Sequence, residues 1–238
     1  MDAVLHVISD RNRHRLPLLE ALAESARGGA DVIQIREKKA PASETYGLVR
    51  ALQQICTEER LSSRILVNDR VDIALSAGIA GVHLAAKSLP IPAAAQLRRQ
   101  IGWSGMIGCS VHSLDEAIRA QGAGADYVTF GHVFASESHP GLPPRGLYAL
   151  RRVTEALSIP VIAIGGIDRA NVGAVLETGC SGVAVIGSVL NAEDPLAAVK
   201  RLKEAMKRSG SSPKVPFCPT APDLAPAAPL IGSHTKEG

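Results

Sequence analysis

The sequence predicts a single α/β domain, a (β/α)₈ (TIM) barrel, from three observations. The chain has 238 residues, close to the length of about 250 that is typical of this fold. Hydrophobic residues make up 46% of it and aromatic residues only 3%, a composition that suits buried aliphatic strands and the helices that cover them. Short apolar runs also alternate with helical patterns, as repeated βα units require.

Eight apolar runs are predicted to be strands, spaced roughly 25 residues apart. In chain order they span residues 5–8, 32–35, 65–67, 81–84, 106–109, 127–130, 161–164 and 182–185. Helical spacing of apolar residues is found at 16–27, 43–59, 114–121, 147–157 and 195–208. Eight repeats favour closure into a barrel over an open doubly wound sheet, and no GxGxxG follows the first strand.

The barrel is expected to span residues 1–208, followed by a disordered proline-rich tail at 209–238. The net charge is only +3 and no basic cluster is interleaved with aromatic residues, which disfavours nucleic-acid binding. No apolar run approaches the roughly 20 residues of a membrane span. The four cysteines are scattered, which fits a reducing, cytoplasmic location and offers no structural zinc site. A homo-oligomer is compatible with the sequence.

Polar residues that directly follow the strands are the candidate site, because active sites of these barrels lie at the C-terminal strand ends. Gln34, Arg36 and Lys38 alternate along one strand and share a face that suits an anionic ligand. The alternative is an ion-pair layer that closes the barrel mouth. The other candidate binding residues are Asn68, Ser110, Ser136, Ser138, Gly165, Gly166, Ile186, Gly187 and Ser188.

Two glycine-containing turns, Gly165-Gly166 and Gly187-Ser188, are predicted to bind a phosphate group. They follow strands seven and eight, where phosphate often binds in this fold. Tight turn geometry alone is the alternative.

His132 directly follows the sixth strand, where an imidazole can exchange protons near neutral pH. A structural role in apolar surroundings is the alternative for this residue. His83 and His112 are expected to be structural, because His83 lies within a strand and His112 precedes a helix that Ser113 and Glu116 are expected to cap.

These strand-end residues resemble the family that contains thiamine phosphate synthase and the TenI-type thiazole tautomerase. The resemblance covers residues 4–208. It depends on Gln34-Ile35-Arg36-Glu37-Lys38, Asn68-Asp69, Gly81-Val82-His83-Leu84, Gly108-Cys109-Ser110 and Ala163-Ile164-Gly165-Gly166-Ile167, which follow one another in the family's order. It implies an enzyme of thiamine biosynthesis that binds a small phosphorylated thiazole.

The synthase branch of this family joins a pyrimidine diphosphate to a thiazole phosphate with Mg²⁺. The resemblance implies that the Gln-x-Arg-x-Lys strand and Asn68 would hold the diphosphate, and that Asp69 and a second aspartate would hold the metal. Here Ser88 stands in place of that second aspartate, after Lys87, and His139 stands where the synthase pattern has a lysine.

The tautomerase branch is the closer resemblance, on Gly131-His132-Val133-Phe134, Ser110-Val111-His112-Ser113-Leu114, Gly141-Leu142 and Arg145-Gly146. It implies that His132 is a proton shuttle. The main hypothesis is therefore an isomerase, a thiazole tautomerase that aromatises a 2-carboxythiazole phosphate without metal or cofactor, with Arg36 or Lys38 on the carboxylate. The alternative is thiamine phosphate synthase, a transferase with Mg²⁺ at Asp69. A third is a non-catalytic sensor of a thiamine precursor.

Overall fold

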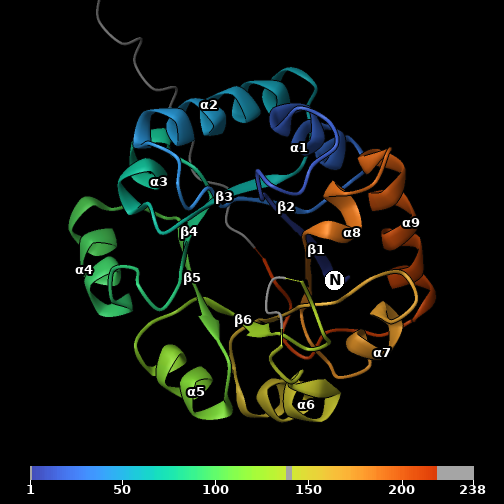
Figure 1. The fold of residues 1–238 in the computed structure, drawn as a ribbon. Coiled ribbons are helices and arrows are strands. Elements are labelled where there is room, and N and C mark those ends of the chain that lie inside the picture. The colour runs from blue at the N-terminus through green and yellow to red at the C-terminus, as the bar shows by residue number, and fades with distance from the viewer. Residues whose placement is uncertain (1, 138–140, 219–238) are drawn as a thin grey trace, which may run out of the picture.

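The computed structural model describes residues 2–137 and 141–218. Over these residues, parallel strands β1 to β8 pair in chain order, and β8 pairs with β1 to close the barrel. Helices surround the barrel on all sides (Figure 1). The strands are β1 (Val4–Ile8), β2 (Val32–Ile35), β3 (Arg64–Asn68), β4 (Gly81–Leu84), β5 (Met106–Val111), β6 (Tyr127–Gly131), β7 (Val161–Ile164) and β8 (Gly182–Val185). The predicted fold is thus confirmed.

The helices follow the strands in turn. They are α1 (Leu18–Arg27), α2 (Ala42–Glu58), α3 (Val71–Ala77), α4 (Ile91–Ile101), α5 (Leu114–Gly122), α6 (Gly146–Ala156), α7 (Val172–Leu176), α8 (Gly187–Leu190) and α9 (Pro195–Arg208). The predicted cap of α5 is present, since the Ser113 side chain accepts a hydrogen bond from the backbone N–H of Glu116 at 3.2 Å. No helix in the described part of the chain is long and apolar enough to cross a membrane.

Side chains alternate between two cores along each strand. In β1, Leu5 and Val7 belong to the core between strands and helices, whereas Val4 and Ile8 belong to the cluster inside the barrel. Because of this period of two, every second side chain of a strand points towards the barrel axis. At the C-terminal strand ends, such side chains line a cavity.

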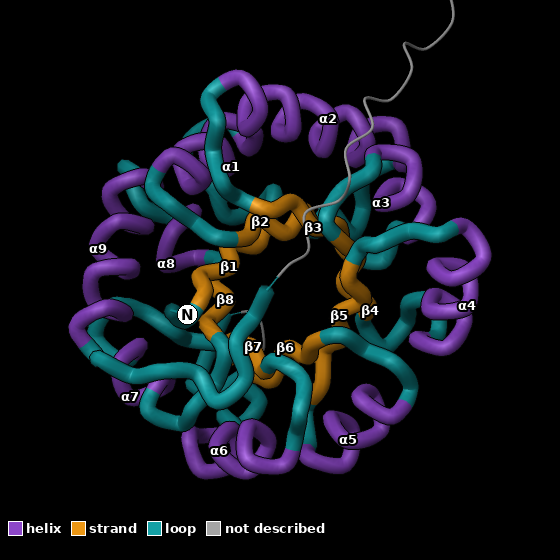
Figure 2. The backbone as a smooth tube through the Cα atoms, turned by 180° about the vertical axis from the view of Figure 1, so that it is seen from behind, coloured by secondary structure: helices purple, strands orange, loops and turns teal. Residues whose placement is uncertain are grey.

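The segment after α9 closes the opposite, N-terminal end of the barrel, which corrects the predicted boundary of a disordered tail at residue 209. Lys214 is fixed by its backbone N–H to Gly179 O at 3.0 Å and by its Nζ to Glu155 O at 2.6 Å. Phe217 is 4% exposed and belongs to the cluster inside the barrel. Figure 2 shows this end of the barrel, with the described chain ending near its axis. Residues 219–238 lie outside the described residues.

His6, on the inner face of β1, is fully buried, and neither ring nitrogen has a hydrogen-bond partner among the described residues. Burial, and secondarily the nearby His83, lowers the pKa of His6 to about 3. Burial likewise lowers the pKa of His83 to about 4. Both imidazoles are therefore neutral in the folded protein at neutral pH.

The buried, neutral imidazoles of His6 and His83 predict that the folded protein loses stability in acid. Because both folded pKa values lie below the unfolded value of about 6.5, the unfolded chain binds protons first as the pH falls. The melting temperature should therefore decrease progressively from about pH 6.5 towards pH 3. A His6→Leu variant should show a shallower decrease, and an unchanged slope would contradict the burial of a neutral His6.

Candidate active site

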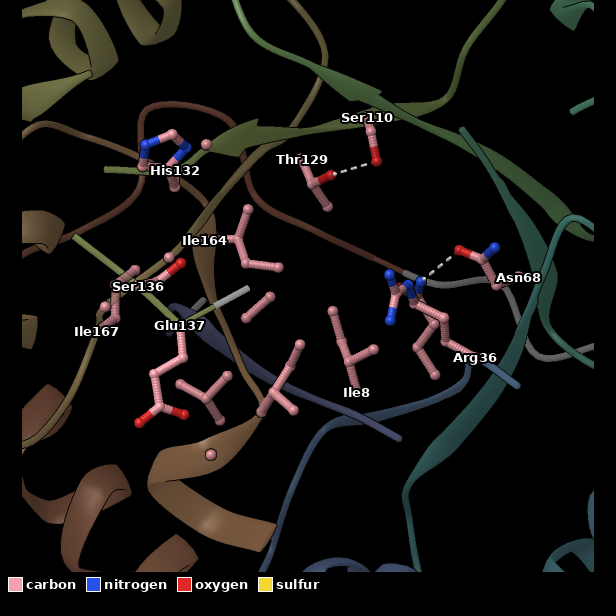
Figure 3. Close-up of a pocket in the computed structure, with 18 of the residues that line it drawn as sticks. Ile8, Arg36, Asn68, Ser110, Thr129, His132, Ser136, Glu137, Ile164 and Ile167 are labelled. Atoms are coloured by element: carbon pink, nitrogen blue, oxygen red, sulfur yellow. Dashed lines mark hydrogen bonds between the residues drawn. The ribbon is translucent and has the colours of Figure 1, made fainter. Parts of the chain in front are cut away.

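A cavity of about 940 Å³ opens at the C-terminal ends of the strands. Figure 3 shows part of its wall, with His132 and Ser110 on one side and Arg36 and Asn68 on another. The predicted site residues that line it are Gln34, Arg36, Lys38, Asn68, Asp69, Ser110, His132, Ser136, Gly165, Gly166, Ile186, Gly187 and Ser188. Ser138 and His139 lie outside the described residues. The barrel thus gathers almost all of the predicted site in one place.

A chain of polar side chains connects β2 to the loop after β4. Gln34 Nε2 donates to Asn68 Oδ1 at 3.3 Å, and Asn68 Nδ2 donates to Asp69 Oδ2 at 2.6 Å. The Ser88 hydroxyl donates to the other carboxylate oxygen of Asp69. Gln34 Oε1 is buried without a hydrogen-bond partner among the described residues, so it can accept from a ligand in the cavity.

Glu37 does not belong to the cavity wall, although it lies between Arg36 and Lys38. Its carboxylate accepts from Ser9 Oγ at 2.6 Å and forms an ion pair with Arg11, and its side chain is only 1% exposed. Arg36 and Lys38 therefore line the cavity without the opposing charge of Glu37. The alternative for this strand was an ion-pair layer that closes the barrel mouth. The ion pair found here joins Glu37 to Arg11 and does not include Arg36 or Lys38.

His132 lies in the cavity wall immediately after β6 and is 3% exposed. Its Nε2 lies 3.3 Å from the carbonyl oxygen of Leu142. A carbonyl can only accept, so this contact favours the tautomer with a proton on Nε2. The arrangement suits a general base that faces a bound ligand.

His83 and His112 also line the cavity, which the expectation of purely structural roles missed. His112 Nδ1 lies 2.7 Å from the carbonyl oxygen of Gly131, the residue before His132. His112 therefore supports the backbone that carries His132. Strand periodicity shows which face a residue is on, but it does not show how far along the barrel axis the cavity reaches.

The glycine turn after β7 is packed against the loop that carries His132. Gly165 has a φ of 105°, and a Cβ there would lie 2.5 Å from the Cβ of His132. Gly166 has a φ of 64°, and a Cβ there would lie 2.4 Å from Ala135 O. Both glycines are therefore required by backbone geometry, and they bring the turn and His132 side by side.

Arg13, in the loop after β1, is a cavity residue that the sequence analysis did not name. Its Nη1 donates to Glu137 Oε2 at 2.8 Å and lies 3.9 Å from where a Cβ on Gly187 would be. It places a guanidinium beside the first turn of α8. Arg13 lies five residues beyond the end of β1, so its proximity to strand ends gives no signal in the sequence.

Metal ligands are sparse in this cavity. The described residues contain no group of three or more His, Cys, Asp or Glu side chains that could hold a metal ion. Asp69 is the carboxylate expected from the resemblance; the Ser88 hydroxyl donates to it, and Lys87 also lines the cavity. The carboxylates of Glu137 and Asp168 also line the cavity, and Glu137 is paired with Arg13. Because Ser88 stands where the synthase branch has its second aspartate, the residues at Asp69 do not fit the two-carboxylate magnesium site expected of that branch.

Comparison with known proteins gives a consistent result. The family model described as thiamine monophosphate synthase matches residues 5–189. A thiamine-phosphate synthase of Pyrococcus furiosus is 39% identical over 203 residues, which cover 85% of this chain and 94% of the relative. One of Chlorobium luteolum is 41% identical over 204 residues, covering 85% and 92%.

Solved structures give the same picture. Thiamine phosphate pyrophosphorylase from Pyrococcus furiosus superposes with a TM-score of 0.78 at 38% identity, and the match covers 87% of this chain and 96% of that one. A 3-hexulose-6-phosphate synthase has a TM-score of 0.63 at 21% identity over 85% and 99% of the two chains, which shows the shared barrel fold.

Proposed function

The chain belongs to the thiamine monophosphate synthase family, and from that premise we propose that this enzyme of thiamine biosynthesis aromatises a 2-carboxythiazole phosphate by a proton shift at His132. The observation that carries the proposal is the position of His132 in the cavity wall, packed against the Gly165-Gly166 turn. A substrate whose phosphate group lies at that turn would place its ring beside the imidazole.

The proposed reaction is an isomerisation in which every atom of the substrate is retained. His132 removes the proton from the ring carbon that bears the carboxylate, and the C–H bonding electrons enter the ring. The π electrons of the exocyclic double bond form the new C–H bond when the same imidazole returns the proton to the exocyclic carbon. One base serves both carbons if both present the same ring face to it. Such acid–base catalysis typically contributes about 10²–10⁴-fold.

The charged groups of the cavity fit the two anionic ends of this substrate. Arg36 and Lys38 are proposed to hold the carboxylate, because a guanidinium beside an ammonium favours an anion. The Gly165-Gly166 turn, the backbone at Gly187-Ser188 and the guanidinium of Arg13 are proposed to hold the phosphate. The backbone N–H groups in the first turn of a helix have no partner within the helix.

The second candidate is thiamine phosphate synthase, which the named relatives favour over the tautomerase. Gln34, Arg36, Lys38 and Asn68 line the cavity as that reaction would need. Against it stand two departures from the synthase pattern, Ser88 in place of the second aspartate and His139 in place of a lysine. We therefore derive no metal-dependent step for this chain.

The two candidates are distinguished by assaying synthase activity directly. Purified protein would be given the pyrimidine diphosphate, thiazole phosphate and Mg²⁺, and thiamine phosphate would be measured by fluorescence after oxidation. The proposal predicts little or no product beside an authentic synthase as positive control. Rapid multiple turnover would instead establish the synthase as the primary activity. If the protein binds thiazole phosphate but catalyses neither thiamine phosphate synthesis nor tautomerisation, the result would favour the non-catalytic sensor.

Replacing Arg13 by glutamine should raise the KM for the phosphorylated substrate by roughly tenfold, because a hydrogen bond to a charged group contributes about 1.5–3 kcal/mol. The matched control is Arg15→Gln, since Arg15 also forms an ion pair, with Glu193, but does not line the cavity. Steady-state kinetics would measure both variants. Equal KM values for the two would remove Arg13 from the phosphate site.

A further inference from the structure

A hydrogen-bonded chain of side chains leads from the barrel interior to the cavity. His83 Nδ1 lies 3.0 Å from the hydroxyl oxygen of Tyr127, and His83 Nε2 lies 2.9 Å from Ser110 Oγ. Tyr127 is fully buried and His83 is 2% exposed, whereas Ser110 is half-buried and lines the cavity. The chain therefore connects a buried phenol to a hydroxyl that a ligand can reach.

The strand register explains why these groups meet. His83 on β4 is level with Gly108 on β5, and Gly108 is level with Tyr127 on β6. A Cβ on Gly108 would lie 2.1 Å from the ring carbon Cζ of Tyr127. The missing side chain thus leaves the space through which the Tyr127 ring crosses β5 to reach His83.

The direction of the hydrogen bonds follows from the chemistry of the three groups. His83 is neutral at pH 7, so one ring nitrogen donates and the other accepts. Among the described residues, His83 Nδ1 is the partner recorded for the Tyr127 hydroxyl, and a buried hydroxyl proton without an acceptor is costly. Tyr127 therefore donates to Nδ1, and Nε2 carries the proton that it donates to Ser110.

Ser110 Oγ accepts from His83 Nε2, so its own hydroxyl proton points away from His83. The Thr129 hydroxyl lies 3.4 Å from Ser110 Oγ, the contact drawn in Figure 3, and 3.3 Å from His83 Nε2. Ser110 lines the cavity, where its hydroxyl proton can be donated to a ligand.

We propose that Tyr127 and His83 are positioning residues that hold Ser110 as a hydrogen-bond donor to the substrate. The inference rests on the proposed function, and it adds a requirement on the substrate. The substrate atom beside Ser110 must be an acceptor, such as a carboxylate oxygen of the thiazole, and an amino group at that position would be rejected.

The first test reads the tautomer of His83 without any substrate. Nitrogen NMR of histidine-labelled full-length protein should show His83 protonated at Nε2 and unprotonated at Nδ1. Removing the hydroxyl in Tyr127→Phe keeps the ring that packs against Phe217 at a centroid distance of 5.2 Å, and should populate the other tautomer. Tyr148→Phe, which changes a tyrosine that is 76% exposed, is the control. A wild-type His83 protonated at Nδ1 would overturn the proposal.

The second test is a double-mutant cycle on kcat/KM. Ser110→Ala should lower kcat/KM by roughly tenfold to a hundredfold, the range for a hydrogen bond to a charged acceptor. Tyr127→Phe alone should lower it by about three- to tenfold. In the Ser110→Ala background, Tyr127→Phe should have no further effect, because Tyr127 acts through Ser110.

Equal losses from Tyr127→Phe in both backgrounds would mean a general structural role, and would overturn the proposal. If the wild type turns over neither the tautomerase nor the synthase substrates, the proposed function fails. The tautomer of His83 then still decides the positioning inference, since that measurement needs no substrate.

Discussion

Replacing His132 by glutamine is expected to lower kcat for tautomerisation by about 10²–10⁴-fold, the usual contribution of general acid–base catalysis. Glutamine can still donate to the carbonyl oxygen of Leu142, so the loop after β6 should keep its conformation. Binding of the aromatic carboxythiazole phosphate should be nearly unchanged. Stopped-flow kinetics and calorimetry would measure the two quantities separately.

The matched control for this variant is His14→Gln. His14 also contacts a leucine carbonyl through a ring nitrogen, at 2.5 Å from Leu16 O, and it does not line the cavity. Its kcat should stay within about twofold of the wild type, because it touches no reacting group. If His132→Gln kept more than a third of the wild-type kcat, His132 would not be the base.

Replacing Phe217 by alanine is expected to lower the free energy of unfolding by about 3–5 kcal/mol. The ring lies 4.9 Å from His6 and 5.2 Å from Tyr127, measured between ring centroids, and it is 4% exposed inside the barrel. Its removal leaves a cavity that strands held in a closed barrel cannot easily collapse to fill. Denaturant unfolding monitored by circular dichroism would measure the change.

Tyr148→Ala is the control for the loss of an aromatic ring, because that side chain is 76% exposed on α6. Its effect should be within about 0.5 kcal/mol of zero, as for most surface substitutions. A loss below about 1 kcal/mol for Phe217→Ala would mean that the ring does not pack inside the barrel in solution.

The fold was predictable because its signal is periodic. Eight apolar runs gave all eight strands. Which residues of β1 face the barrel interior was not visible in the sequence, because both faces of Val4–Ile8 are largely apolar. The C-terminal segment was not predictable in this way. Prolines around Phe217 disfavour helix and strand but do not prevent an irregular segment from packing, and its partners, His6 and Tyr127, are distant in sequence.

The site was predictable as far as it follows strand ends. Arg36 and His132 come directly after β2 and β6, Asn68 is the last residue of β3, and the barrel brings them to one cavity. The hydrogen-bonded chain through His83 depends on which residues are level across three strands, and no single segment contains that register. The choice between tautomerase and synthase depends on a few positions that change the charge around the ligand. Ser88 is one of them, because it replaces an aspartate of the synthase pattern.

The most direct test of the central claim is the wild-type rate of tautomerisation. Full-length protein in catalytic amounts would be mixed with the dearomatised 2-carboxythiazole phosphate, with EDTA present, and the aromatic product followed by proton NMR. We predict many turnovers per enzyme, well above the rate in buffer and unchanged by EDTA. A rate no greater than that in buffer, from protein that forms thiamine phosphate when given Mg²⁺ and the synthase substrates, would contradict the account.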